Sequence, residues 1–365
     1  MKTSSTTHCL VSFLDYIYRQ LEKRKTSVAV ASIDFTKAFD LVDHNIIINK
    51  AIDLGLRRSL IPWLTDFLSD RRQAVRFRGA VSTFQSLTCG VPQGTKMGPL
   101  CFLMLINDAL RETPARWKYV DDSTIGISVN NSAPDYTAPQ DLLNILQNWD
   151  TNNHVTINHT KTMVMHINLS SDIVPPPSIT LGPNTIQVVD STKLLGVTID
   201  NKLNWKPHIS EVVESSSFRL HLLRRLKSLG VPAPELLGVY TTFILPKLTY
   251  ASPTWSSSLN ATQRKHLENV QKRACKIILS SSSSTYQEAL NTLTLSTLTD
   301  HHHDLICKFG KKLLHHPRHR LLLPHEIPSP RIAVRHHNRI QPIRARTDRY
   351  KNSPVPTIVK IINNL

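Results

Sequence analysis

Two adjacent carboxylates, Asp121 and Asp122, follow a short strand-like run that ends at Val120. A third, Asp34, directly follows the apolar run 28–33, which predicts a strand. Acidic groups at neighbouring strand ends supply the clustered oxygens that two divalent cations need in phosphoryl transfer. Each feature alone has a plainer interpretation, since Asp-Asp pairs are common and a strand-end Asp can cap the following helix. Together they predict a two-metal site for nucleotidyl transfer.

A bulky ring and a glycine-rich segment accompany these acids. Phe39 comes five residues after Asp34, where its ring would exclude a 2′-hydroxyl from a nucleotide site. The alternative is that Phe39 is an ordinary aromatic residue of the core. The glycines of segment 90–99 let the backbone approach a ligand closely, and the helix that follows offers its N-terminus to an anion. There Gln93 is placed to hydrogen-bond a base or the backbone, and Lys96 to meet a phosphate. The alternative for this segment is a plain turn.

The charge of the chain favours a polyanionic partner. Its 365 residues include 44 Lys and Arg against 27 Asp and Glu, a net charge of +17. Nucleic acid is the first partner expected from such a balance and an anionic membrane the second. Five cysteines lie far apart without a CxxC pair, so neither a disulfide framework nor a zinc ribbon is expected. No apolar stretch is long enough to span a membrane and no secretory signal is evident, so an intracellular, reducing setting is expected.

Periodicity predicts alternating helices and strands up to about residue 200, followed by a helical region. Strands are expected at 28–33, 73–79, 161–167 and 194–199, the second alternating apolar and basic residues as a half-exposed strand facing an anion would. Helices are expected at 10–21, 46–54, 60–68, 97–110 and 139–150, and through most of 201–279. The proline-containing segment 173–183 is typical of a connector, and 280–284 of a flexible hinge.

The end of the chain, after about His301, is rich in His, Arg and Pro and poor in acids. We expect it to be poorly ordered, or ordered only on binding, with its arginines contacting phosphates. The His clusters at 301–303 and 315–316 match no familiar zinc spacing, so an exposed and partly cationic surface is expected there.

Three ordered segments carry a resemblance to a known family: IDFTKAFDLVDH, GVPQGTKMGPLCFLMLINDA and YVDD. They resemble motifs A, B and C of the reverse transcriptases of non-LTR (LINE-type) retrotransposons, of the Jockey and chicken-repeat kind. Segment 158–162 resembles motif D, 193–197 the primer grip, and the helical region up to residue 274 the thumb. The resemblance covers the chain from about residue 1 to about residue 325.

The resemblance implies a role for individual residues. The metal-binding aspartates of the family match Asp34, Asp121 and Asp122, and the lysine that protonates pyrophosphate matches Lys161, for which a solvated surface position is the alternative. Phe35 matches the residue that lends a backbone carbonyl to the site, and Phe39 the gate that discriminates sugars. The nucleotide and template site as a whole is matched by Phe35, Phe39, Gln93, Gly94, Lys96 and Tyr119.

The fold implied is a right-hand polymerase of the α+β class. Its expected parts are a remnant of the fingers (1–25), the palm (26–43 and 89–200), a fingers insertion (44–88), a helical thumb (201–300) and a basic tail (301–365). The implied cofactor is a pair of Mg²⁺ ions, with Mn²⁺ as a substitute. The implied partners are an RNA template, a DNA primer and dNTPs, without a membrane, in the nucleus or the cytoplasm; no protein partner is indicated.

The chain departs from the family at its beginning. Residues 4–8 resemble a segment from inside the family's polymerase domain, so finger strands that hold the triphosphate, and an endonuclease domain, would precede it. We therefore expect an N-terminally truncated copy with an intact catalytic triad and little autonomous activity.

Other functions predict different features. A catalytically silent remnant would bind RNA or DNA in a salt-dependent way without incorporating dNTPs. A group II intron maturase would show another domain after the thumb. A viral RNA-dependent RNA polymerase would more often show Gly-Asp-Asp, and Phe39 favours deoxynucleotides.

Overall fold

The computed structural model describes residues 4–170, 177–280, 285–326 and 340–364. Within them the chain forms two compact units. The first, here the helical unit, comprises Met1–Thr26, Ile167–Leu169 and Asp190–Leu365. The second, here the sheet unit, comprises Ser27–His166 and Ser170–Val189. Separate helices and largely antiparallel strands confirm the expected α+β class.

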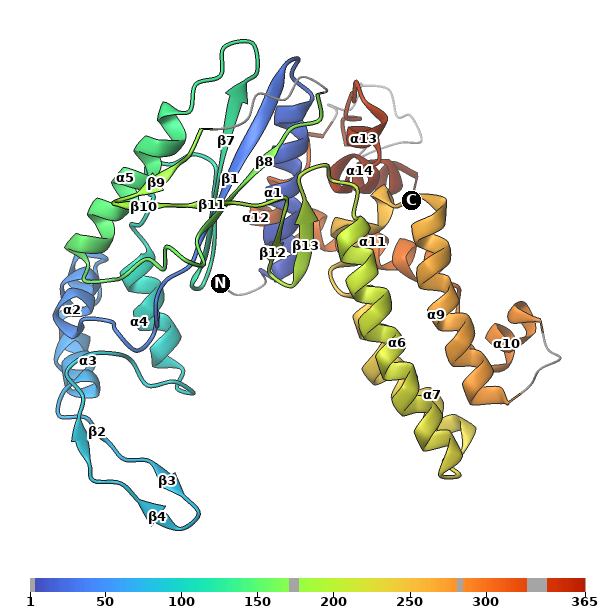
Figure 1. Ribbon diagram of the computed structural model, residues 1–365, viewed down its shortest axis with the longest axis horizontal. Coiled ribbons are helices and arrows are strands. Elements are labelled where there is room, and N and C mark those ends of the chain that lie inside the picture. Colours follow the sequence, from blue (N-terminus) through green and yellow to red (C-terminus); the bar gives the residue numbers. More distant parts are fainter. Residues whose placement is uncertain (1–3, 171–176, 281–284, 327–339, 365) are drawn as a thin grey trace, which may run out of the picture. The chain divides into compact units, whose positions relative to one another are not determined.

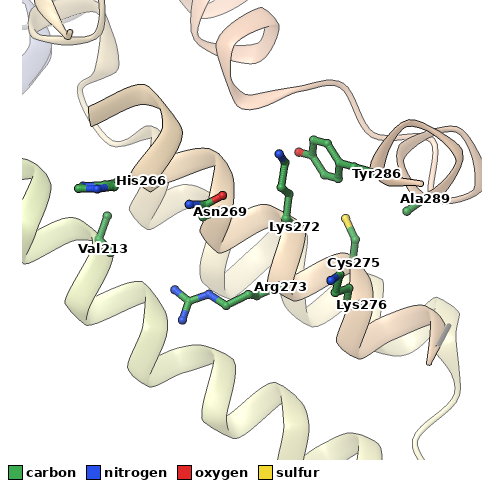
Figure 2. Close-up of a pocket in the computed structure, with 9 residues that line it drawn as sticks. All are labelled: Val213, His266, Asn269, Lys272, Arg273, Cys275, Lys276, Tyr286 and Ala289. Atoms are coloured by element: carbon green, nitrogen blue, oxygen red, sulfur yellow. The ribbon is translucent and has the colours of Figure 1, made fainter. Parts of the chain in front are cut away.

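In the helical unit, long helices follow an N-terminal helix and a small hairpin. The helices are α1 (Thr6–Leu21), α6 (Lys206–Ser228), α7 (Ala233–Val239), α8 (Leu245–Thr249), α9 (Ala261–Leu279), α10 (Tyr286–Thr292), α11 (Leu298–His315), α12 (Pro317–Arg320), α13 (Asp348–Lys351) and α14 (Pro354–Asn364). A π-helical turn, η2 (Tyr240–Ile244), joins α7 to α8, and the short 3₁₀ turns η3 (Ser252–Thr254) and η4 (Ser256–Ser258) follow. Figure 1 shows α6 and α9 packed side by side. A pocket opens where these two helices meet α10 (Figure 2).

The predicted strand at 194–199 is wrong, because the chain turns back in its middle. Strands β12 (Ser191–Leu194) and β13 (Val197–Asp200) pair antiparallel, with Leu194 opposite Val197. The two residues between them, Leu195 and Gly196, have φ of 47° and 82°. Two consecutive left-handed residues form the tight turn that suits the twist of a hairpin.

Asp200 fixes the start of α6. Its side chain is buried, and its two carboxylate oxygens accept hydrogen bonds from the backbone N–H groups of Lys202, Asn204 and Trp205 at 2.9–3.1 Å. Trp205, the residue before the helix, is itself buried and left-handed, with φ of 63°. A buried carboxylate that accepts several N–H groups offsets both its own desolvation and the strain of such a turn.

The described part of the C-terminal region is folded, so the expectation of poor order is wrong there. Val355, Ile358 and Val359 of α14 share a buried cluster with Ile306 of α11 and Val11 of α1. The same region is tied to α1 by polar contacts. The carboxylate of Glu22 accepts hydrogen bonds from the backbone of Arg346 at 2.6 Å and of Thr347 at 3.2 Å.

An exposed surface was expected at the histidines near residue 301, but not all of them are exposed. His302 is buried on α11, and its Nε2 lies 3.0 Å from the Leu248 carbonyl. Burial lowers the pKa of His302 to about 4, so this ring is neutral at pH 7. The hinge expected at 280–284 lies outside the described residues except for Ser280, the residue that ends α9.

The sheet unit is built on five strands in the order β11-β8-β1-β7-β6. They are β1 (Thr26–Ile33), β6 (Arg116–Tyr119), β7 (Asp122–Asn130), β8 (Met163–Ile167) and β11 (Gln187–Val188). A short pair, β9 (Thr180–Leu181) and β10 (Asn184–Thr185), lies apart from them. The central strand β1 is buried along most of its length, which is why it reads as an unbroken apolar run.

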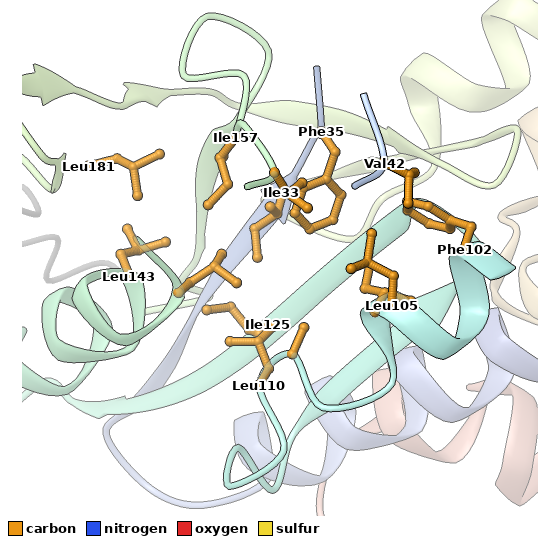
Figure 3. Packing of buried hydrophobic residues seen from close by; sticks show 14 of the residues in the cluster. Ile33, Phe35, Val42, Phe102, Leu105, Leu110, Ile125, Leu143, Ile157 and Leu181 are labelled. Carbon is orange, nitrogen blue, oxygen red and sulfur yellow. The ribbon is translucent and has the colours of Figure 1, made fainter. Parts of the chain in front are cut away.

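Helices pack against this sheet and close a core around the strand ends. They are α2 (His44–Asp53), α3 (Ile61–Leu68), with the 3₁₀ turn η1 (Arg58–Leu60) before it, α4 (Met97–Ile106) and α5 (Thr137–Asn152). Figure 3 shows Phe35 and Ile33 meeting Leu105 and Phe102 of α4 in this core. Fully burying a side chain of this size contributes roughly 1.5–3 kcal/mol, so the core fixes the end of β1 firmly.

A two-stranded ribbon follows α3 in place of the half-exposed strand predicted at 73–79. It consists of β2 (Arg72–Gln73), β3 (Arg76–Phe77), β4 (Ala80–Val81) and β5 (Gln85–Ser86). Arg78 and Gly79, with φ of 47° and 88°, form its tight turn, which ends the predicted strand early. Figure 1 shows the ribbon extending away from α3, and its side chains are exposed, Phe77 and Phe84 at 68% each.

Lys118 anchors β6 to the end of α4. Its ammonium group donates hydrogen bonds to the carbonyls of Ile106, Asn107 and Ala109 at 2.9–3.0 Å. These carbonyls belong to the last residue of α4 and to the turn that follows it, where the regular helical hydrogen bonds end. Burial, and secondarily the charge of Arg116, lowers the pKa of Lys118 to about 8. No helix within the described ranges is long and apolar enough to cross a lipid bilayer.

Asp200→Ala should lower the free energy of unfolding by about 3 kcal/mol, because several N–H groups lose a charged acceptor. Chemical denaturation followed by circular dichroism measures this value. Asp200→Asn, which keeps one oxygen acceptor, should lose less. Asp141→Asn, at an exposed position, is the control. Equal stability of Asp200→Ala and the unmodified chain would contradict the role given to Asp200.

Lys118 should make the stability depend on alkaline pH. Its folded pKa of about 8 lies below the ordinary 10.5, so between these values the unfolded chain binds more protons than the folded one. The contribution of Lys118 to the free energy of unfolding should therefore rise with pH across this window. Comparing the unmodified chain with Lys118→Met at pH 7.5 and pH 10 isolates this contribution. If the difference in the free energy of unfolding between these two proteins stays constant or shrinks from pH 7.5 to pH 10, the pKa of Lys118 is not lowered.

Candidate active site

A tight hairpin presents Asp121 and Asp122. Strands β6 and β7 pair antiparallel with Tyr119 opposite Asp122, which leaves only Val120 and Asp121 in the turn. Val120 has φ of 60°. A β-branched residue in this left-handed region costs on the order of 1–3 kcal/mol and persists only where the surrounding structure over-determines it. The hairpin therefore holds Asp121 exposed at its tip and Asp122 at the first position of β7.

Asp34 reaches the same edge of the sheet from the neighbouring strand. β1 and β7 are adjacent, and Asp34 directly follows β1. At the opposite end of this pair the hydroxyl of Ser27 donates to the carbonyl of Val129, at 3.5 Å. The start of β1 thus lies beside the end of β7, so the strands run antiparallel. Asp34 and Asp122 consequently lie at one end of the pair.

The carboxylates at this edge interact electrostatically. The pKa of Asp122 is raised by burial first, then by the charge of Asp121 and by that of Asp34. Like charges raise a carboxyl pKa only when they lie within a short distance of it. Asp122 therefore lies within electrostatic range of both Asp121 and Asp34, and a divalent cation would relieve this repulsion.

A complete metal cage is not built from protein groups alone. Within the described ranges no group of three or more His, Cys, Asp or Glu side chains is close enough to hold a metal ion. Mg²⁺, however, is usually bound through one or two carboxylates together with substrate phosphates and water. Exposed and half-buried carboxylates that repel one another fit such a site, because they supply hard oxygen ligands and leave room for a substrate.

The backbone of Asp34 is clamped by the segment that precedes β8. Its carbonyl accepts from the N–H of Asn158 at 2.8 Å, and its own N–H donates to the Thr162 hydroxyl at 3.3 Å. Phe35 forms a bridge to Ile157 and is buried, with its ring edge-on to Trp149 in the core. This arrangement fixes where the Asp34 carboxylate lies.

Lys161 lies beside this carboxylate. Its ammonium group is 4.0 Å from Oδ2 of Asp34, and the two side chains are 69% and 41% exposed. An exposed pair of this kind contributes little to stability, so Lys161 is free to move toward another anion.

The glycine-rich loop packs against the turn that follows Asp34. The Gln93 amide donates to the Asp40 carboxylate at 3.0 Å, and the ring of His44 hydrogen-bonds the Gly90 carbonyl at 2.7 Å. Gly90 is left-handed, and a Cβ there would lie 2.5 Å from the Asp40 carbonyl oxygen. A larger residue would push these segments apart, so Gly90 sets the position of Gln93.

Phe39 and Lys96 occupy different environments. The half-buried ring of Phe39 lies 4.9 Å from that of Phe102 on α4, and its carbonyl accepts from Val91. Lys96 is exposed and directly precedes α4. Gly94 is left-handed, with open space around it.

Residue patterns had not singled out Lys118 or the contact made by Asp40, because neither has a spacing that signals it.

Comparison with known proteins identifies the family. The sequence profile described as reverse transcriptase (RNA-dependent DNA polymerase) matches residues 2–199. The RNA-directed DNA polymerase from the mobile element jockey of Drosophila melanogaster is 23% identical over 86% of this chain and 35% of its own length. The probable RNA-directed DNA polymerase from transposon BS of the same fly is 26% identical over 67% of this chain and 28% of its own length.

The chain thus spans about a third of the length of these relatives. Among solved structures, a telomerase from Candida albicans in complex with a fragment of telomeric RNA aligns with a TM-score of 0.40 and 12% identity, over 80% of this chain and 50% of that one. Since the family profile covers more than half of its 365 residues, this protein belongs to the reverse transcriptase family.

Proposed function

We propose that this chain carries out RNA-directed DNA synthesis, as the polymerase domain of a non-LTR retrotransposon. In the reaction, the 3′-hydroxyl of a primer attacks the α-phosphorus of a dNTP and pyrophosphate leaves. The observation that supports the proposal is that Asp34, after β1, and Asp122, at the start of β7, lie at the same end of two neighbouring strands, with Asp121 adjacent, in a chain of this family.

Asp34, Asp121 and Asp122 would hold two Mg²⁺ ions, or Mn²⁺ in their place. When bound, the ions would activate the primer hydroxyl and neutralise the triphosphate and its leaving group. The chain supplies positioning: the hairpin turn fixes Asp121, and the backbone clamp fixes Asp34. Such pre-organisation is the main contribution a protein makes to phosphoryl transfer.

Lys161 would donate the proton that the leaving pyrophosphate needs. The support is its position 4.0 Å from Asp34 and its exposure, which leaves the ammonium group free to turn toward a phosphate oxygen. A proton donor near a developing oxyanion accelerates its departure.

Nucleotide and template would contact the loop and turn around Asp34. Gln93 is held by Asp40, and Gly94 leaves open space beside it. Lys96 would meet a phosphate. Phe39, supported by Phe102, would form a firm wall against a ribose 2′-hydroxyl. The backbone of Phe35 and the side chain of Tyr119 would complete the site.

The partners would be an RNA template and a DNA primer. The support is the net charge of +17 and the exposed ribbon, which carries Arg72, Arg76 and Arg78 beside its aromatic rings. Fingers, palm and thumb remain proposed names for the parts of the two units. None of the five cysteines, all of them in the described part of the chain, is in a disulfide, which suits synthesis in the nucleus or cytoplasm.

Asp121→Asn should reduce primer extension on an RNA template about 100-fold or more, because one metal-binding oxygen is replaced by an amide. Incorporation of labelled dNTP with Mg²⁺ measures this. The exposed Asp141→Asn should retain full activity. RNA binding without incorporation by the unmodified chain would instead select the silent remnant, and activity that survives Asp121→Asn would reject the assigned site.

Phe39→Ala should relax the choice of sugar. Removing the ring opens space at the 2′ position, so incorporation of rNTP relative to dNTP should rise about tenfold, the size of effect that a lost steric contact gives. Single-nucleotide insertion assays with both substrates measure the ratio. Phe39→Tyr, which keeps the bulk, should leave the ratio unchanged. A ratio that is the same in all three proteins would make Phe39 an ordinary core residue.

A further inference from the structure

The helical unit contains a pocket that has no part in the proposed polymerase site. Its volume is about 630 Å³, within the range of small-molecule sites. One side of α9 forms its floor, α6 contributes Val213, and α10 contributes Tyr286 (Figure 2).

The pocket is positively charged. Lys272, Arg273 and Lys276 line it, and among its described lining residues none is acidic. None of the ion pairs found within the described ranges involves these three cations. The Arg273 guanidinium donates to the Ser217 hydroxyl at 2.8 Å, and the Lys272 ammonium lies 4.9 Å from the ring centre of Tyr286. These three side chains thus bring positive charge to the pocket, which favours an anion.

Tyr286 is a rigid wall of this pocket. Its hydroxyl donates to the Glu268 carboxylate and accepts from the Gln271 amide at 3.0 Å. Gln271 in turn accepts from the Tyr240 hydroxyl at 2.6 Å, and Glu268 accepts from the backbone of Leu298. A ring fixed in this way offers an aromatic surface at little cost in side-chain entropy.

The remaining lining suits a ligand with a flat, partly polar body. Val213, Cys275 and Ala289 add an apolar surface on which a flat ring can lie. Asn269 adds both a donor and an acceptor beside them, as needed to bind the edge of a nucleobase. Cations for a phosphate, an aromatic wall and an amide are the groups that recognise a phosphorylated nucleoside.

We propose that this pocket binds a nucleoside phosphate, with its phosphate at Arg273 and Lys276 and its base between Tyr286 and Asn269. The site goes beyond the proposed function, because it shares no residue with the carboxylate edge. Two sources have this chemistry: a free nucleotide and a single unpaired nucleotide of a nucleic-acid strand.

The test is binding to the full chain in EDTA, where synthesis cannot occur. Calorimetry with AMP, with inorganic phosphate and with a five-nucleotide single-stranded RNA compares the two sources with a bare anion. Arg273→Glu and Lys276→Glu should each weaken AMP binding about tenfold or more, as loss of a charge-assisted contact does. Lys265→Glu makes the same charge change on the same helix outside the pocket, and should change the affinity for AMP less than about twofold.

Tight binding of AMP points to a free nucleotide, and binding of the RNA alone points to a nucleotide within a strand. Phosphate binding as tightly as AMP would overturn recognition of a base. An equal loss in Lys265→Glu would overturn the pocket, because the attraction would then be general. Asp121→Asn should abolish synthesis and leave AMP binding intact, so failure of the polymerase proposal and failure of this one are distinguishable. Circular dichroism of each variant confirms that it is folded.

Discussion

Repulsion between carboxylates at one edge of a buried sheet is the constraint on which the rest of this structure depends. Two unit charges 4 Å apart repel by roughly 4 kcal/mol at an effective dielectric constant of about 20. The pKa of Asp122 is raised by burial first and then by the charges of Asp121 and Asp34, so the fold bears part of this cost. It can do so because β1 is buried along most of its length and Asp34 is held by its backbone on both sides. A more mobile strand end would let the carboxylates move apart, and their oxygens would then no longer be close enough to bind cations together.

Strain in the hairpin follows from the same requirement. Val120 adopts a conformation that glycine would adopt more readily, and it places Asp121 in the two-residue turn and Asp122 at the first position of β7. A glycine there would widen the range of conformations open to the turn. Lys118 helps to maintain the strained turn at Val120, because its contacts with the end of α4 hold the preceding strand β6 in place. The rigid site is therefore maintained by residues that do not themselves contact a substrate.

The spacing of apolar residues predicted the helices and strands that keep one regular spacing throughout. It failed where the chain turns, or where a segment packs against residues far away in the sequence. β1 and the start of α4 at Met97 were predicted because apolar runs and a glycine-rich loop mark them. The turn at Leu195 and Gly196 was missed because leucine is not a typical turn residue and the apolar pattern continues through it. The C-terminal helix was missed because Val355 and Ile358 bury themselves against α1, at the other end of the chain. Of the site, the pairing of β1 with β7 places Asp34 and Asp122 at one end of these strands, and the roles of all the site residues stay predictions.

A protein with a net charge of +17 that gathers acids at its proposed active site faces opposing electrostatic demands. The overall field attracts a polyanion, whereas the carboxylate edge repels the phosphates that must react there. Bound cations would reconcile the two, because they reverse the sign of the potential only where the acids are. Nucleic acid held by exposed arginines elsewhere would then react only when metal is present. Binding and chemistry would then have separate electrostatic origins, so replacing a single aspartate would remove synthesis and leave the affinity for nucleic acid in place.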